Sequence, residues 1–179
     1  MKTEFVNVLK YDFYSEKILA YHDISVRTIN ILLQLRAYNI IEEDEFQKNI
    51  EFFTGLYISF MSKFNRITYK YQNMMNQIFD NNVGGDERAT LLDNYISEDK
   101  IKEFNEDIEN FESSYFTVQE TIVNMLDDMA LAKMFLLDFQ LLSVLEEEFS
   151  HVYNLIETVE VEFGEFEDTI ISSEDYEDE

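Results

Sequence analysis

Apolar residues recur along most of the chain at alternating steps of four and three, the spacing that keeps one face of an α-helix apolar. The clearest example spans residues 46–78, with the seam Phe46, Ile50, Phe53, Tyr57, Phe60, Phe64, Ile67, Tyr71, Met74 and Ile78. Acidic residues 42–45 precede this seam, and carboxylates favour a helix N-terminus. Residues 80–85 contain two Asn and two Gly, which predicts a turn. The pattern therefore predicts one long helix with a buried face.

A second seam follows Ser97, which is placed to cap a helix N-terminus. It comprises Ile101, Phe104, Ile108, Phe111, Tyr115, Val118, Ile122, Met125, Met129, Ala132, Leu136 and Phe139. The register then slips and resumes as Leu142, Leu145, Phe149, Val152, Ile156 and Val159. We predict a bend between two helices near residues 138–142, with a break at Ser113–Ser114 as the alternative. Residues 134–145 are apolar all round, which predicts the most deeply buried stretch.

The two ends of the chain differ in pattern. Residues 5–39 predict a broad amphipathic helix, and a turn at residues 39–42 would return it as an antiparallel hairpin. Residues 159–167 alternate apolar and acidic with period two, which is typical of a strand or of an extended acidic-aromatic tail. Residues 172–179 are almost purely acidic and, alone, are expected to be disordered.

Together these elements predict an all-α fold. We expect an elongated antiparallel bundle of about four long, heptad-patterned helices with coiled-coil-like packing, followed by an acidic C-terminal tail. The domain would span residues 1–168 and the tail residues 169–179.

Charge is distributed unevenly along the sequence. The 179 residues hold 38 Asp and Glu against 13 Lys and Arg, for a net charge of −25. Residues 1–79 hold nine of each sign, whereas residues 80–179 hold four basic and 29 acidic residues. The sequence thus predicts a neutral hairpin (1–79) joined to an acidic half (80–168). Such a chain repels phosphate, so nucleic acids and anionic membranes are excluded as favourable partners.

Catalytic and metal-binding motifs are incomplete. The chain has no cysteine and two histidines. Glu148 and His151 form one Glu-x-x-His motif, but Leu19 occupies the matching position before His22, so a di-metal site lacks its second half. Residues 80–86 resemble the start of a calcium loop, but Leu91 stands where the bidentate acid is required. We therefore predict no enzymatic activity and no cofactor.

Basic residues are few, and three of them, Lys63, Arg66 and Lys70, share one face of the second predicted helix. We expect them to pair with the acidic third helix across the bundle, a small phosphate-binding patch being the alternative.

The acidic face carries the strongest functional signal. Eight acids over residues 98–120 place about one charge per 4 Å of helix, close to the 3.4 Å phosphate spacing of one DNA strand. The predicted partner-binding residues are Glu98, Asp99, Glu103, Glu106, Asp107, Glu109, Glu112, Glu120, Glu160, Glu162, Glu165, Glu167 and Asp168. A merely solvated face is the alternative.

In size, lack of cysteine, acidic helical character and richness in Phe, Tyr, Ile and Asn, the chain resembles the acidic nucleic-acid-mimic inhibitors of phages and mobile elements, such as anti-restriction and anti-CRISPR proteins. The resemblance implies a stoichiometric inhibitor that occupies the positively charged channel of a nuclease or a guide-RNA effector. The partner would be a basic nucleic-acid-binding protein, with no direct contact to nucleic acid or membrane.

Two other functions fit the same sequence: an immunity protein or antitoxin that caps a basic toxin, and a structural coiled-coil adaptor that forms a homodimer through its heptad seams. Without a signal peptide or an apolar run long enough to span a membrane, the expected location is the cytoplasm, either of the producing cell or of an infected bacterial host.

Overall fold

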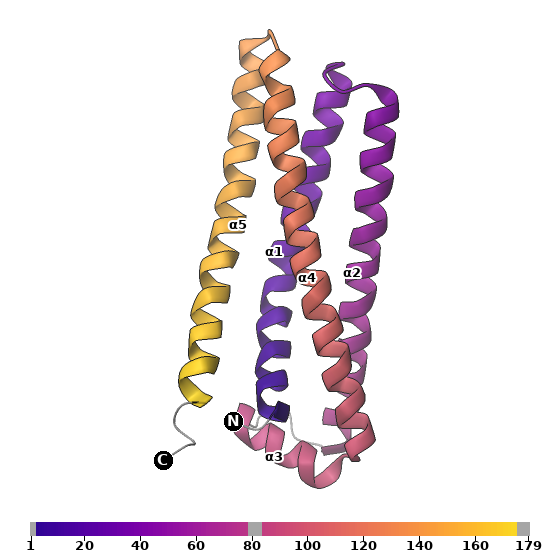
Figure 1. The fold of residues 1–179 in the computed structure, drawn as a ribbon, viewed down its shortest axis with the longest axis vertical. Coiled ribbons are helices and arrows are strands. Elements are labelled where there is room, and N and C mark those ends of the chain that lie inside the picture. The colour runs from indigo at the N-terminus through magenta and orange to yellow at the C-terminus, as the bar shows by residue number, and fades with distance from the viewer. Residues whose placement is uncertain (1–2, 79–83, 175–179) are drawn as a thin grey trace. The chain divides into compact units, whose positions relative to one another are not determined.

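Four long helices and one short helix make up the chain in this computed structural model, which describes residues 3–78 and 84–174 (Figure 1). They are α1 (Thr3–Ala37), α2 (Glu43–Ile78), α3 (Gly85–Tyr95), α4 (Glu98–Ala132) and α5 (Phe139–Glu174), with a 3-10 turn, η1 (Lys133–Phe135), before α5. These ranges contain no strand. The predicted all-α bundle of long helices is confirmed, whereas coiled-coil packing stays a prediction.

The chain divides into two compact units, and each long helix contributes a segment to both. Unit 1 comprises Met1–Lys17, Phe60–Tyr115 and Phe163–Glu179, and unit 2 comprises Ile18–Ser59 and Phe116–Glu162. Unit 1 holds nine basic and 22 acidic residues, a net charge of −13, and unit 2 holds four and 16, a net charge of −12. Both units therefore draw on the neutral and the acidic half of the sequence, and the charge divides almost evenly between them.

The two units have cores of different chemistry. In unit 1 the core is largely aromatic: the Tyr14 ring packs against Phe111 and Tyr115, and Phe60 stacks on Phe111 with ring centroids 5.0 Å apart. In unit 2 it is mostly aliphatic, with fully buried side chains that include Ile31, Leu32, Leu35, Val118, Leu126, Leu145 and Val152. The predicted seam positions are buried or half-buried throughout α2, as the four-and-three spacing requires.

The connection between α1 and α2 lies where the sequence predicts a turn. Asn39 adopts a left-handed backbone conformation with φ of 56°, which Asn tolerates better than most residues. The amide of Ile40 donates to the carbonyl of Leu35 at 2.9 Å, and Arg36 pairs with the Glu43 carboxylate at the start of α2. The turn thus closes α1 and opens α2 within unit 2.

Helix α3 was not predicted, because its 11 residues are too few to show a clear apolar period. Within unit 1 it buries Ala89 and Leu92, and Ile96 follows it. Arg88 of α3 donates to both carboxylate oxygens of Asp12 on α1, at 3.1 and 2.5 Å, and to the hydroxyl of Tyr71 on α2 at 2.5 Å. One guanidinium therefore ties three helices of unit 1 together.

The break between α4 and α5 lies earlier than predicted. Residues 133–138 separate the helices, whereas the expected bend was near residues 138–142. The alternative break at Ser113–Ser114 is wrong, because α4 runs without interruption through both residues. The second seam also shifts near its end: Leu126 is fully buried and Met125 only half-buried.

Residues 134–145 are not the most buried part of the chain. Met134 is 75% exposed, Leu137 91% and Phe139 86%. The expectation assumed a helix enclosed on every side, but residues 134–138 lie in the connection between α4 and α5, and residues 139–145 form the exposed first turns of α5. Only Leu145 in this stretch is fully buried.

The C-terminal alternation does not form a strand. Residues 159–167 are helical, and α5 continues to Glu174. Val159, Phe163, Phe166 and Ile170 keep the four-and-three spacing, and the Phe166 ring stacks on Phe13 of α1 in unit 1, with centroids 4.6 Å apart. The helical period therefore prevails over the shorter period-two pattern. Residues 175–179 of the predicted tail and residues 80–83 of the calcium-like loop lie outside the described residues.

Candidate partner-binding surface

The buried face of α4 determines where its acids point. Ile101, Phe104, Ile108, Phe111 and Tyr115 are buried in unit 1, which leaves the predicted acids on the remaining sides of the helix. Glu98 and Asp99 occupy the first turn, where the helix dipole favours negative charge, and the Ser97 carbonyl accepts from the amides of Lys100 and Ile101.

Two of the predicted contact acids face α2 and are neutralised there. Asp107 lies 2.6 Å from Lys70 Nζ and 3.0 Å from Arg66 Nε, and only 11% of its side chain is exposed. Glu103 is 3.2 Å from the same Lys70. Lys63 donates to the hydroxyl of Ser114 on α4. The predicted pairing with acids across the bundle is therefore confirmed for Arg66 and Lys70, whereas Lys63 meets a hydroxyl group of α4 and not a carboxylate.

Glu112 is also engaged within unit 1. It accepts from Lys10 Nζ at 2.9 Å and from the hydroxyl of Tyr14 at 3.0 Å. Burial raises the pKa of Tyr14, and the nearby negative charges of Glu112 and Glu167 raise it further. Glu112 of α4 and Glu167 of α5 therefore both act on the buried phenol of Tyr14, and Glu112 accepts its hydrogen bond.

The other acids of α4 remain on the surface. Glu98, Asp99, Glu106 and Glu109 are exposed in unit 1, and Glu120 is exposed in unit 2. Of these five acids, only Glu106 has a cation within ion-pair distance among the described residues, Lys102 at 3.9 Å. Apart from Glu103, which is exposed but paired with Lys70, residues 98–112 therefore present four exposed charges, about one per 6 Å of helix. This is close to the spacing of every second phosphate in a strand.

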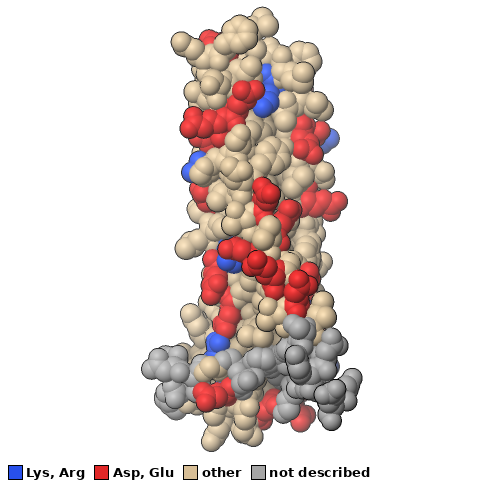
Figure 2. All heavy atoms as spheres, turned by 90° about the vertical axis from the view of Figure 1, so that its left-hand side faces the viewer, with Lys and Arg blue, Asp and Glu red and all other residues tan. Residues whose placement is uncertain are grey.

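The predicted acids of α5 divide between the units. In unit 2, Glu160 accepts from Gln119 of α4 at 2.6 Å, and Glu162 is half-buried. In unit 1, Glu165, Glu167 and Asp168 are exposed. Figure 2 shows one face on which carboxylates are interspersed with uncharged surface, with few cations among them. This face is thus acidic without forming a continuous sheet of charge.

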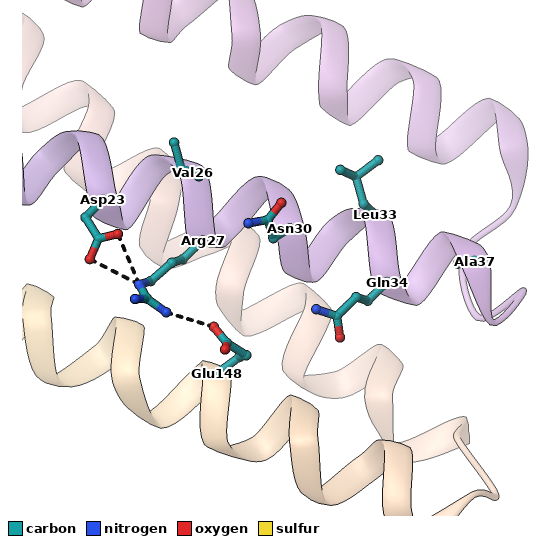
Figure 3. Close-up of a pocket in the computed structure, with 8 residues that line it drawn as sticks. All are labelled: Asp23, Val26, Arg27, Asn30, Leu33, Gln34, Ala37 and Glu148. Carbon is teal, nitrogen blue, oxygen red and sulfur yellow. Dashed lines mark hydrogen bonds and ion pairs between the residues drawn. The ribbon is translucent and has the colours of Figure 1, made fainter.

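A cavity of about 450 Å³ lies between α1 and α5 in unit 2 (Figure 3). Arg27 projects toward it, donating to both oxygens of Asp23 at 3.2 and 3.1 Å and to Glu148 at 3.1 Å. The hydrogen bond to Asp23 raises the pKa of Arg27. Because its charge is already satisfied by two carboxylates, Arg27 is a poor receptor for an anionic ligand.

The motif Glu148–His151 does not assemble a metal centre in the described residues. Glu148 binds Arg27, His151 is exposed, and His22 lies 2.5 Å from the hydroxyl of Tyr57 through its Nδ1 atom. No group of three potential metal-ligating His, Asp or Glu side chains occurs in the part of the chain that the structure describes.

The structure also shows an apolar surface that the sequence did not indicate. Six large side chains at the α4–α5 connection are exposed, and we call them the apolar tip: Leu131, Met134, Phe135, Leu137, Phe139 and Val144. The apolar run predicted burial, although the slip in the seam near Phe139 predicted a bend between two helices in the same stretch. These residues join the acids as candidates for partner contact.

Comparison of the chain with known protein families, with curated proteins and with solved structures finds no match, so its function must be argued from its own residues. None of the described helices combines the length and apolar character needed to cross a bilayer.

Proposed function

We propose that this protein is a stoichiometric inhibitor that presents acidic helices to the positively charged nucleic-acid channel of a nuclease or guide-RNA effector. The observation that carries the proposal is the unneutralised row Glu98, Asp99 and Glu109 on α4, while Lys70 and Arg66 are occupied by Asp107. A surface acid without a counter-ion inside the protein is available to a cationic partner.

Binding would proceed by competition. Lys and Arg side chains that normally hold phosphates would face the exposed carboxylates of α4, and nucleic acid would be excluded from the channel. Long-range attraction between a chain of charge −25 and a cationic channel accelerates association and weakens with salt. The proposal places this competition in the cytoplasm, as the resemblance to phage-encoded inhibitors suggests.

The test is a competition assay with a panel of nucleases and guide-RNA effectors. The protein should reduce nucleic-acid binding and cleavage by its target, and about 0.5 M NaCl should relieve the effect because it shortens the screening length to a few Å. Undiminished cleavage across the panel would reject the proposal.

A charge-reversal variant tests the surface itself. Asp99→Lys, Glu106→Lys and Glu109→Lys together should abolish inhibition while the circular dichroism stays helical. The matched control reverses three exposed acids, Glu42 just before α2 and Asp44 and Glu51 within it, which changes the net charge equally. Equal loss in both variants would mean that net charge, and not the α4 surface, governs binding.

A second candidate is an immunity protein or antitoxin that caps a basic toxin. The apolar tip favours it, because a cap on a folded protein uses apolar contact as well as charge, whereas phosphate mimicry needs charge alone. Co-expression with the product of a neighbouring toxin gene should then restore growth, and failure to do so would remove this candidate.

A further inference from the structure

We propose that the apolar tip is the docking site for an apolar surface patch, rimmed by Lys and Arg, on a protein partner. The inference rests on the proposed function in one respect, that the partner is basic. It adds a contact that phosphate mimicry does not require.

The tip exposes far more apolar surface than an isolated side chain would. Phe135 is 77% exposed and Phe139 86%, so these two rings alone leave on the order of 300 Å² accessible to water. Four further large apolar side chains lie within the same 14 residues. Since the largest apolar patch on a typical monomer is roughly 300–600 Å² and is often functional, the tip has the size of a contact site.

The connection that carries the tip has a defined backbone. The amide of Leu136 donates to the Lys133 carbonyl at 3.0 Å, which closes η1. Asp138 then caps α5, its Oδ1 accepting from the amides of Gln140 and Leu141 at 2.9 and 3.2 Å. Leu137 and Phe139 flank this capping residue and both point into solvent. Apolar side chains on such a preorganised turn cost little further ordering when a partner covers them.

Residues 127–147, which form the connection and the helix turns beside it, hold five acids and one base. Asp127, Asp128, Asp138, Glu146 and Glu147 are exposed on the adjoining ends of α4 and α5. Glu45 of α2 lines the same small hollow as Asp128 and Ala132, which adds an acid from a third helix.

The base within the α4–α5 connection, Lys133, does not offset these acids. Lys133 is 20% exposed, lies 3.9 Å from Glu146 and sits over the Phe149 ring, 4.8 Å from its centroid. The tip therefore combines an apolar centre with an acidic rim, which is complementary to an apolar patch bordered by Lys and Arg.

The acidic rim favours one kind of binding partner for the tip over the others. A second copy of the chain would set acids against acids around the apolar contact, and an anionic membrane would be repelled. A basic protein satisfies both the centre and the rim.

Two designed probe peptides separate apolar docking from charge. The first is an amphipathic peptide of Leu and Lys, and the second keeps every Lys but replaces each Leu by Ser. Fluorescence anisotropy in about 0.15 M NaCl measures their affinities where long-range attraction is partly screened. We expect the Leu/Lys peptide to bind the protein on the order of tenfold or more tighter than the Lys/Ser peptide.

Variants locate that difference on the molecule. Phe135→Ser with Leu137→Ser should remove the tenfold preference, whereas Leu19→Ser with Ile58→Ser, two exposed apolar positions of unit 2 outside the tip, should keep it. Equal affinities of the two peptides for the wild type, or a preference that survives the tip variant, would overturn the inference. The inference would also be overturned if the wild type and the control variant sedimented as dimers and the tip variant as a monomer. A second copy of the chain would then cover the tip.

These outcomes are independent of the nuclease assay. If the protein prefers the Leu/Lys peptide but inhibits no nuclease, the docking site is supported and the nucleic-acid mimic is rejected. If the protein inhibits a nuclease but shows no preference for the Leu/Lys peptide, the nucleic-acid mimic is supported and the tip is not a docking site.

Discussion

The Nζ atom of Lys70 on α2 lies 2.6 Å from Oδ2 of Asp107 on α4, and Arg66 approaches the same oxygen at 3.0 Å. Asp107 is thereby a counter-ion for two cations inside unit 1, although its position in the acidic half made it a candidate for partner contact. The neighbouring Glu109 has the same chemistry but is exposed on the other side of the helix.

We expect Asp107→Asn to lower the free energy of unfolding by about 1–3 kcal/mol, because Lys70 and Arg66 would lose their shared acceptor in a partly buried setting. Glu109→Gln is the matched control and should stay within about 0.5 kcal/mol of the wild type. Urea unfolding measures both. Equal free energies of unfolding for the two variants would show that the contacts of Asp107 with Lys70 and Arg66 contribute no more than an exposed acid does.

Arg88→Gln should loosen α3, since Asp12 and Tyr71 would lose the guanidinium that joins them. The expected cost is about 2 kcal/mol, below that of a fully buried pair because the Asp12 side chain is 36% exposed. Hydrogen exchange should show faster exchange of the amides around Leu92, and Lys100→Gln, an exposed site, should leave them unchanged. Unaltered protection in Arg88→Gln would mean that the apolar contacts of α3 suffice.

Stability should decrease in alkaline solution. Burial and the hydrogen bond to Asp127 raise the pKa of Tyr153 to about 12, and burial beside Glu112 raises that of Tyr14. The folded state therefore retains phenolic protons that the unfolded chain releases near pH 10, so the stabilisation is complete below about pH 10 and is lost as pH rises toward 12.

Tyrosinate absorbance tests the cause. Asp127→Asn should lower the pKa of Tyr153 toward its ordinary value by removing a negative neighbour, and Asp128→Asn should not. A free energy of unfolding that stays flat between about pH 10 and 12 would contradict the assignment.

Two helical glycines should be replaceable with a gain in stability. A Cβ atom added at Gly55 of α2 or Gly164 of α5 meets nothing within 4 Å. Each substitution by Ala should stabilise the protein by about 0.5–1 kcal/mol, because Ala loses less backbone entropy in a helix. Gly84→Ala is the control: this residue precedes α3 as its N-cap, where Ala is disfavoured, so no gain is expected. Thermal unfolding distinguishes the three.

Added NaCl should raise the melting temperature. Units 1 and 2 each carry a large negative charge, and screening weakens repulsion between surface acids more than it weakens partly buried pairs such as Lys70–Asp107. A melting temperature that falls with salt would indicate that ion pairs outweigh self-repulsion.

Much of the secondary structure could be predicted from the sequence. The long seams of α2 and α4 and the turn at Asn39 follow from local spacing, since one helix face repeats every 3.6 residues whatever lies against it. Helix α3 was missed because 11 residues hold too few repeats, and residues 159–167 were misassigned because two periods overlap there.

The candidate site was less predictable, because exposure depends on what the rest of the chain covers. The sequence by itself determined which residues are acidic, which faces of the long helices are apolar, and that cations would be scarce. Only the tertiary structure decided that Asp107 and Glu112 serve the fold while Glu109 faces water, and that Phe135 and Leu137 are exposed. The physical reason is that helix periodicity is local, whereas ion pairing and burial depend on residues that folding brings together from distant parts of the chain.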